Sequence, residues 1–232
     1  MNVDLHCHTN MSDGSLTPEQ LVELANERAL DILSITDHDT LDAYSTIKVI
    51  PPRLQLITGI EFSSQWRKQG IHIVGLNVDP LSESIIFGVG QQKKARLDRA
   101  EKIAERLSNL GFEYCLEGAT LLAHGQIGRP HFAQHLVNIG AVSNIKQAFK
   151  KYLGAGKVGD IKEQWAETAT VIQWIRESGG IAVLAHPSKY KMTRTKLKEL
   201  LTDFCSAGGE GMEVISGLQV PAVTRDLATL CN

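Results

Sequence analysis

Short apolar segments alternate, in the first part of the chain, with segments whose apolar residues have helical spacing. Residues 3–6 are typical of a buried strand, and residues 17–20 (TPEQ) have the N-cap, first-turn proline and capping-box glutamine of a helix that we expect to end near Leu30. A second strand is predicted over residues 31–36, directly before Asp37-His38-Asp39. This region therefore predicts one β-α-β unit.

The same pattern recurs further along: an apolar run reaches a polar residue able to bind a metal. Strands are predicted over 54–60, 70–76, 180–185 and 211–215, and they carry or precede Glu61, His72, His186 and Glu213. Because helical segments separate several of these runs, we expect parallel strands whose carboxyl ends share one face, with Glu213 a candidate for that face. The predicted fold class is α/β, a distorted β/α barrel.

Between residues 91 and 159 the pattern is helical and poor in strands. Helices are predicted over 95–110, 130–139 and 144–153, each followed by a glycine. Basic and acidic residues alternate between Lys93 and Arg106, which is typical of a solvated helix face. We therefore expect residues 1–90 and 160–232 to form the barrel and residues 91–159 to be inserted as a helical cap.

Composition restricts the possible partners. With 232 residues, of which 43% are hydrophobic, the chain can bury the core of one large domain, and its net charge of −2 provides no positive field for long nucleic acid. The four cysteines have no paired spacing, and no signal-peptide or membrane-length apolar run is present. We expect a cytoplasmic protein without a membrane partner, and the sequence leaves its protein partners open.

Histidines and acids follow the predicted strands. His6 and His8 lie two residues apart at a strand end, so both project from one face while Cys7 points away. A single histidine is more often an ordinary half-buried residue than a ligand. Repetition at successive strand ends favours a metal centre, whose candidate ligands are His6, His8, Asp13, His38, Glu61, His72 and His186.

These donors indicate the chemistry of the predicted centre. Imidazole nitrogen and carboxylate oxygen suit manganese, zinc or iron, and seven donors are too many for one ion. We expect two or three divalent metal ions, with Glu61 as a bridging carboxylate. Such a centre favours hydrolysis of a phosphoester by a metal-bound hydroxide, although amide or amidine hydrolysis uses the same ligand types.

Arg129 and His131 flank Pro130 at a predicted helix start, where backbone N–H groups favour an anion. Arg129 offers a bidentate fork and is a candidate phosphate clamp, with His131 as a second substrate-binding residue. The alternative is that Arg129 is a surface residue and His131 a helix cap.

The ordered strings DLHCHT, SDG, ITDHDT, GIE, IHIVGLN and AVLAHP resemble the polymerase and histidinol phosphatase (PHP) superfamily over nearly the whole chain. The segments RPHFA and KYLGAGK are similar to its YciV (TrpH-like) branch. That branch contains 3′,5′-nucleoside bisphosphate phosphatases and 5′-to-3′ exoribonucleases that act on short RNA. The resemblance implies a TIM-like barrel and places Lys157 at the mouth of the site.

Residue by residue, the resemblance implies a trinuclear centre. His6, His8 and Glu61 would hold one ion, Asp13 and His38 a second, and Glu61, His72 and His186 a third. The family also uses an Asp-x-His pair on a late strand, and this pair is not found before Asn232. We expect the protein to continue past Asn232 into the final barrel strand.

The sequence therefore predicts a metal-dependent phosphoesterase. It is expected to hydrolyse the 3′-phosphate of nucleoside 3′,5′-bisphosphates, short 5′-phosphorylated RNA, or both. The predicted catalytic residues are His8, Glu61 and Arg129, and the predicted substrate-binding residues are Arg129, His131 and Lys157. The alternatives are a non-catalytic metal-binding scaffold and a histidinol-phosphate-type phosphatase.

Overall fold

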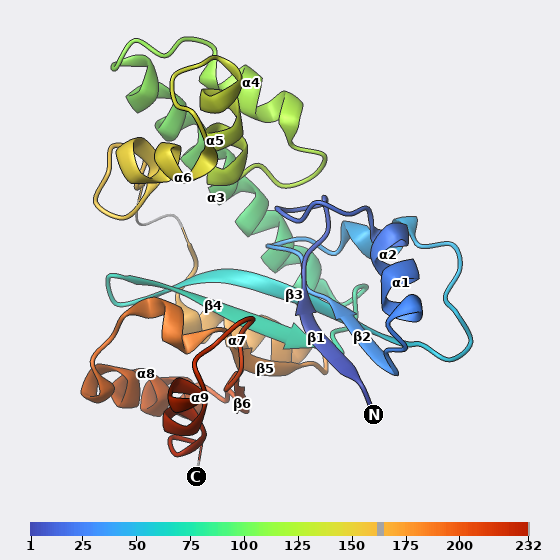
Figure 1. Ribbon diagram of the computed structural model, residues 1–232. Coiled ribbons are helices and arrows are strands. Elements are labelled where there is room, and N and C mark those ends of the chain that lie inside the picture. The colour runs from blue at the N-terminus through green and yellow to red at the C-terminus, as the bar shows by residue number, and fades with distance from the viewer. Residues whose placement is uncertain (162–164, 232) are drawn as a thin grey trace.

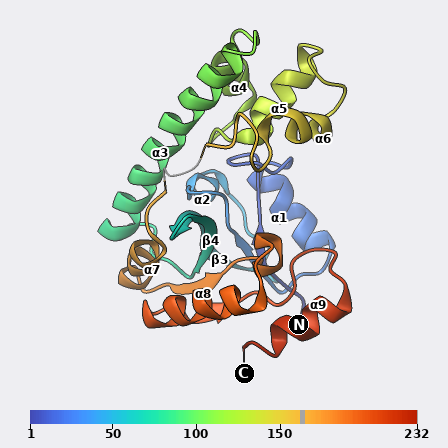
Figure 2. The ribbon, with the colours of Figure 1, turned by 90° about the vertical axis from the view of Figure 1, so that its left-hand side faces the viewer.

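A computed structural model describes residues 1–161 and 165–231, and in it the strands form one curled sheet surrounded by helices (Figures 1 and 2). Six strands are hydrogen-bonded in chain order, from β1 to β6. Their bounds are β1 Val3–Cys7, β2 Ile32–Ile35, β3 Gln55–Trp66, β4 Gln69–Leu76, β5 Ile181–Leu184 and β6 Gly211–Met212. The fold is mixed α/β with a half-barrel sheet, which agrees with the predicted class in its coarse outline.

The helices are α1 Pro18–Glu27, α2 Asp42–Thr46, α3 Glu83–Ser108, α4 Cys115–Leu122, α5 Arg129–Asn138, α6 Ile145–Ala148, α7 Thr168–Glu177, α8 Arg194–Ser206 and α9 Pro221–Ala228. A π-helical segment, Phe149–Leu153, follows α6, and a 3₁₀ turn, Pro187–Tyr190, follows β5. No helix within residues 1–161 and 165–231 has the length and apolar composition needed to cross a bilayer.

The predicted β-α-β unit is confirmed at the amino terminus. Gln20 N donates to Thr17 Oγ1 at 3.3 Å, and Thr17 N donates to Gln20 Oε1 at 2.9 Å, so the capping box starts α1 where the sequence indicates. α1 packs its apolar face against β2, and the two strands on either side of it, β1 and β2, are parallel. The first metal-type residues therefore leave the sheet at one edge.

The expectation of parallel strands throughout is wrong for β4. β1, β2 and β3 are parallel, but β4 is antiparallel to both β3 and β5, while β6 is parallel to β5. The cause is local: β3 continues to Trp66, and only Arg67 and Lys68 separate it from β4. Two residues close an antiparallel hairpin but cannot make the crossover that a parallel strand requires.

The sheet is curled but open between its first and last strands. Among the described strands, β1 pairs only with β2 and β6 only with β5, so a closed barrel is not formed. The curl nevertheless brings the ends of β1 and β6 together, because His6 Nδ1 lies 2.5 Å from Glu213 Oε1. The carboxyl ends of β1, β2, β5 and β6 and the middle of β3 thus face a common space.

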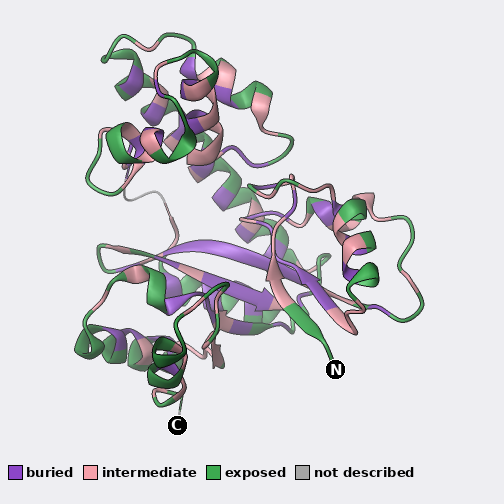
Figure 3. Cartoon of the chain, in the orientation of Figure 1, coloured by how far each residue is buried: buried purple, intermediate pink, exposed green. Residues whose placement is uncertain are grey.

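Helix α3 joins two separate apolar cores, seen as purple stretches in Figure 3. Its first half contributes Ile85 to the core of the sheet, which includes β3, β4, β5, α7 and α8. Its second half contributes Ala100, Ile103 and Leu107 to a core shared with α4, α5 and α6. We call α4, α5, α6 and this second half of α3 the helical unit; it lies on one side of the sheet in Figure 1.

The start of α3 differs from the predicted residue 95. The helix begins at Glu83, because Ser82 precedes it in an extended conformation and Ile85, Gly88 and Gln92 are buried on its inner face. Gly88 and Gly90 interrupt the amphipathic pattern in this part of the sequence. At Gly88 the ring of Trp174 fills the space that a Cβ would occupy, so the glycine permits close packing of α3 on α7.

Candidate metal centre

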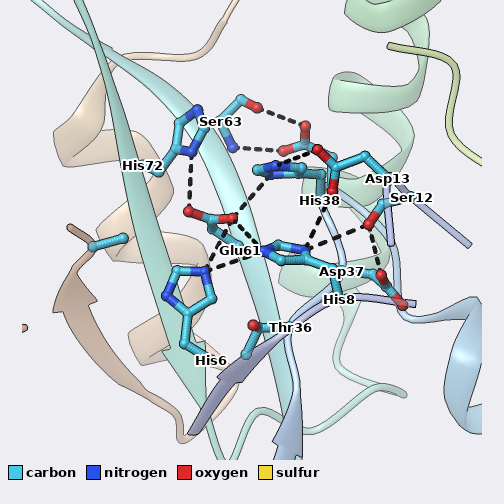
Figure 4. Close-up of polar contacts among 12 residues, drawn as sticks. His6, His8, Ser12, Asp13, Thr36, Asp37, His38, Glu61, Ser63 and His72 are labelled. Atoms are coloured by element: carbon cyan, nitrogen blue, oxygen red, sulfur yellow. Dashed lines mark hydrogen bonds and ion pairs between the residues drawn. The ribbon is translucent and has the colours of Figure 1, made fainter. Parts of the chain in front are cut away.

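The seven candidate ligands form one cluster at the common edge of the sheet. β1 supplies His6 and leads to His8, β2 leads to His38, β3 carries Glu61, β4 carries His72 and β5 leads to His186. Asp13 comes from the loop after β1. Figure 4 shows Glu61 between the imidazoles of His6, His8, His38 and His72. The structure brings together all seven candidate ligands that the sequence indicates. Their role as metal ligands stays a prediction.

Glu61 is the centre of the cluster. Its side chain is only 1% exposed, and five imidazoles contact it. Oε2 lies 3.0 Å from His38 Nδ1 and 3.2 Å from the Nε2 atoms of His6 and His8. Oε1 lies 2.7 Å from His186 Nε2 and 2.9 Å from His72 Nδ1. A single carboxylate is thus in position to bridge several ions.

Three buried atoms of the candidate ligands have no hydrogen-bond partner among the described residues: Glu61 Oε2, His38 Nδ1 and His186 Nδ1. Glu61 Oε2 and His38 Nδ1 are buried and have no hydrogen bond, although they lie 3.0 Å apart. Buried polar atoms are usually satisfied, and those without a protein partner call for an ion or water. His6 Nε2 and His8 Nε2 likewise face each other at 3.3 Å. The donor set therefore fits cations.

The donors form three groups that could each hold an ion: His6, Glu61 and His186; His8, Asp13 and His38; and His38, Glu61 and His72. This grouping differs in part from the one implied by the family resemblance. His8 also lies within 3.3 Å of both His6 Nε2 and Glu61 Oε2, so the implied first group is equally compact. The shared residues show that the ligands form a continuous site rather than three isolated ones.

Cys7 does not belong to the site, as the strand alternation predicts. Its Sγ donates to the carbonyl of Ser34 at 3.2 Å and packs with the core around α1. Burial raises the pKa of the Cys7 thiol. A buried, protonated thiol is a poor metal ligand, so the centre has only nitrogen and oxygen donors.

Burial and charge set the protonation of the ligands in the protein alone. Burial lowers the pKa of His38 and of His186, so both imidazoles are neutral and have a free lone pair. Burial alone would raise the pKa of Glu61, but its interactions with the surrounding imidazoles, of which those with His38 and His72 are the largest, hold it well below its usual range. Glu61 is therefore an ionised carboxylate.

The pKa of His6 is shifted in the opposite direction to those of His38 and His186. Burial alone would lower its pKa, but hydrogen bonds to Glu213 and Glu61 outweigh burial and raise the pKa to about 10. A cation that binds Nε2 has to displace a proton from this ring. Metal binding at this position therefore releases a proton.

Asp37 and Asp39, which flank His38, hold backbone segments rather than an imidazole. Asp37 accepts hydrogen bonds from Thr9 N at 2.7 Å and from Ser12 Oγ at 2.6 Å, and Ser12 Oγ lies 3.5 Å from His8 Nδ1. These contacts, several of which are drawn in Figure 4, shape the loop that carries Asp13. Within the described part of the chain, neither aspartate bonds to a candidate ligand imidazole.

Asp39 is part of a fully buried network beside the cluster. It accepts hydrogen bonds from Ser63 N at 2.7 Å, from Gln92 Nε2 at 3.0 Å and from Arg96 Nε at 2.7 Å. Its backbone has φ of +55°, which is uncommon for a residue other than glycine. The network joins the β2–β3 region to α3, and therefore to the helical unit.

A cavity of about 700 Å³ opens beside the cluster. Asp13, His38 and His72 are among its lining residues, together with Arg96, Arg99, Arg129 and Trp165. The guanidinium carbons of Arg96 and Arg99 each lie 5.3 Å from the centre of the Trp165 ring. One cavity is thus lined by metal-type donors, by cationic groups and by an aromatic ring.

Of the three arginines that line the cavity, Arg99 forms no ion pair within the described residues. In the part of the chain that the structure describes, its buried Nε atom has no hydrogen bond, and no ion pair involves its guanidinium. Burial, together with the nearby charges of Arg129 and Arg96, lowers the pKa of Arg99 to about 9. A half-buried guanidinium with this surplus of positive charge favours an anionic ligand.

Of the three predicted substrate-binding residues, only Arg129 is among the described residues that line the cavity. Arg129 lines the cavity, where Nη1 donates to Leu153 O at 3.2 Å and lies 3.7 Å from Asp160 Oδ1. His131 Nδ1 accepts from Gly128 N at 3.0 Å and caps the start of α5. Lys157 is exposed. Neither Lys157 nor His131 is among the described residues that line the cavity.

Sequence reasoning missed Arg96 and Arg99. Both were expected on a solvated helix face, but Arg96 is 7% exposed and pairs with Asp39. A signal was available: Gln92, Arg96, Ala100 and Ile103 have the spacing of one helix face, and Arg99 lies beside it. Charged residues on an apolar stripe indicate burial with a partner or a ligand.

Comparisons with known proteins agree with this geometry. Residues 4–180 match the PHP domain family. The Escherichia coli protein named 5′-3′ exoribonuclease Rnm is 43% identical over 234 residues, which cover 99% of this chain and 80% of that protein. The Chromobacterium violaceum protein named 3′,5′-nucleoside bisphosphate phosphatase is 39% identical over 220 residues, which cover 93% of this chain and 77% of that protein.

Two solved structures have the same fold. An amidohydrolase from Chromobacterium violaceum, solved with bound sulfate and no metal, has a TM-score of 0.90 and 37% identity, and the match covers 99% of this chain and 82% of that chain. A predicted metal-dependent phosphoesterase from Bifidobacterium adolescentis has a TM-score of 0.84 and 28% identity, with the same coverage of 99% and 82%. The match extends over the sheet and the helical unit together.

Proposed function

The chain belongs to the PHP domain family, and we propose that it is a metal-dependent phosphoesterase. It hydrolyses the 3′-phosphate of nucleoside 3′,5′-bisphosphates and removes nucleotides from the 5′ end of short 5′-phosphorylated RNA. The observation that carries the proposal is the buried carboxylate of Glu61, contacted by five imidazoles, next to a cavity that arginines also line. Cation ligands and guanidinium groups that face one space suit a phosphate ester.

Two or three divalent ions, manganese, zinc or iron, are assigned to the cluster. Its ligands are His6, His8, Asp13, His38, Glu61, His72 and His186. Bound there, such ions lower the pKa of a water molecule and offset the negative charge of a phosphoryl group. The protein contributes the imidazoles of His38 and His186, which burial holds in the neutral form, and the ionised carboxylate of Glu61.

The arginines position the phosphate that does not react. Arg99 lines the cavity and forms no ion pair within the described residues, and Arg129 lines the same cavity. Between them they offer forked N–H donors to a terminal phosphate, and Trp165 offers a ring face to a base. Arg99 thus takes the role that the family resemblance suggested for Lys157, which lies exposed on a turn.

The helical unit acts as a cap over this end of the site. It brings Arg99 and Arg129 from α3 and α5 to the cavity, while the sheet brings the metal-type donors. We therefore keep residues 91–159 as the cap and residues 1–90 and 160–232 as the catalytic unit. The Asp39–Arg96 pair sets the position of the cap relative to the catalytic unit.

Replacing Arg99 or Arg129 with alanine should raise KM for adenosine 3′,5′-bisphosphate. Hydrogen bonds to charged groups contribute roughly 1.5–3 kcal/mol each, which corresponds to an increase of about 10- to 100-fold with a smaller effect on kcat. Steady-state phosphate release measures both constants. Lys157→Ala should leave KM unchanged, and an increase for this variant alone would return the role to Lys157.

The proposed activity is tested directly with the purified protein. After chelation and dialysis it should release no phosphate from adenosine 3′,5′-bisphosphate and no mononucleotide from a short 5′-phosphorylated RNA, and added Mn²⁺ should restore both reactions. Phosphate is measured by a colorimetric assay and the RNA products by chromatography. A metal-loaded protein that is inactive on both substrates would contradict the proposal and favour the scaffold alternative.

A further inference from the structure

Glu213 contacts two candidate metal ligands, His6 on the first strand of the sheet and His186 after the fifth. It follows β6, and its backbone N donates to Leu184 O at 3.0 Å. Its Oε1 lies 2.5 Å from His6 Nδ1, at the end of β1. Its Oε2 accepts from the backbone N of His186, after β5, at 2.6 Å. One carboxylate thus spans the opening between the first and last strands.

The contact with His6 determines which ring nitrogen is available. When a cation displaces one proton from the ring, the carboxylate at Nδ1 holds the remaining proton there, and Nε2 becomes the lone-pair atom. That nitrogen is the one that faces the cluster, 3.2 Å from Glu61 and 3.3 Å from His8 Nε2. Glu213 therefore selects both the tautomer and the orientation of the ring that a cation needs.

The contact with His186 holds a strained backbone. His186 has φ of +29° and ψ of 58°, in a region that residues other than glycine rarely adopt. Such a conformation persists only where the surroundings restrain it. Glu213 fixes the His186 N–H, and the adjacent Ala185 is held by His72 O and by the Tyr190 hydroxyl. The conformation directs His186 Nε2 to within 2.7 Å of Glu61 Oε1.

We propose that Glu213 is a positioning residue that sets His6 and His186 in the geometry for metal binding. The inference rests on the proposed function only through its metal centre. Both of its partners donate hydrogen bonds, so the position requires two acceptor atoms on one side chain. A carboxylate provides them, whereas the amide of glutamine has one acceptor oxygen and presents N–H groups to the other donor.

The test compares Mn²⁺ binding by the wild type, Glu213→Gln and Glu210→Gln. Calorimetric titration of the metal-free proteins should show about 10- to 100-fold weaker Mn²⁺ binding in Glu213→Gln, the usual loss when a group that orients a ligand is changed. Glu210 lies three residues earlier with an exposed side chain, and its variant should bind as the wild type does. Thermal unfolding of the metal-free proteins confirms that each is folded at the titration temperature.

If Glu213→Gln does not fold, Glu213→Asp replaces it. Aspartate keeps both acceptor oxygens but is one methylene shorter, so it cannot reach both N–H groups, and it should also bind Mn²⁺ more weakly. Wild-type affinity in the folded variant, or an equal loss in Glu210→Gln, would overturn the role of Glu213 and leave the proposed function intact. A wild-type protein that binds no Mn²⁺ would overturn both.

Discussion

Replacing Glu61 with glutamine should reduce phosphate release from adenosine 3′,5′-bisphosphate by about 10³-fold or more, because metal ions contribute several kcal/mol to phosphoryl transfer. Glutamine has nearly the same shape but offers one neutral oxygen where the carboxylate offers two charged ones. Five imidazoles would then lack their shared anion. We expect the variant to retain fewer metal ions per chain, as measured by elemental analysis after dialysis.

The matched control is Glu27→Gln at the exposed end of α1, which should retain full activity and metal content. Far-UV circular dichroism shows whether the Glu61 variant keeps its secondary structure. A Glu61→Gln protein within tenfold of wild-type turnover would mean that the central carboxylate is not a ligand that the reaction needs.

Replacing Asp39 with alanine should destabilise the protein by about 3–5 kcal/mol, the usual cost of leaving a buried charge unpaired. Asp39 is fully buried and accepts hydrogen bonds from Arg96, Gln92 and Ser63. For a protein of this size the loss corresponds to a decrease in Tm of roughly 6–20 °C. Differential scanning calorimetry of the metal-free protein measures it without interference from bound ions.

Two further variants identify the cause. Asp98→Ala on α3, the helix that carries Arg96, removes an exposed ion pair with Lys94. This change should lower the free energy of unfolding by less than about 1 kcal/mol. Adding Arg96→Met to Asp39→Ala removes the unpaired charge and should recover part of the lost stability. If Asp39→Ala lowers Tm no more than Asp98→Ala does, the buried pair is not what joins α3 to the sheet.

The donor set of the metal centre could be predicted because each member has a local signal. His6 and His8 alternate on a strand, and His38, Glu61 and His186 each lie where an apolar run ends or becomes polar. Strand ends that share an edge then bring the residues together without any knowledge of the loops. The grouping of donors into individual sites depends on side-chain orientation, and the sequence pattern carries no information on it.

Periodicity in the sequence predicts neither the direction of β4 nor the burial of Arg96 and Arg99 beside the cavity. The alternation of β3 continues past Glu61 to Trp66, and reading the strand as ending at Ile60 hides the two-residue hairpin. Arg96 and Arg99 look like surface charges, because only the packing of α3 against the β2–β3 region and Trp165 buries them. Long-range packing, rather than local preference, decides both features.

The uninterrupted α3 has a mechanical consequence. At 1.5 Å per residue its 26 residues form a rod of about 39 Å, anchored in one core through Ile85 and in another through Leu107. The Asp39–Arg96 pair fixes the middle of this rod to the sheet. Arg99, which lines the cavity, lies three residues further along the same helix, so we expect the rod to hold its guanidinium at a fixed distance from the layer that carries the imidazoles.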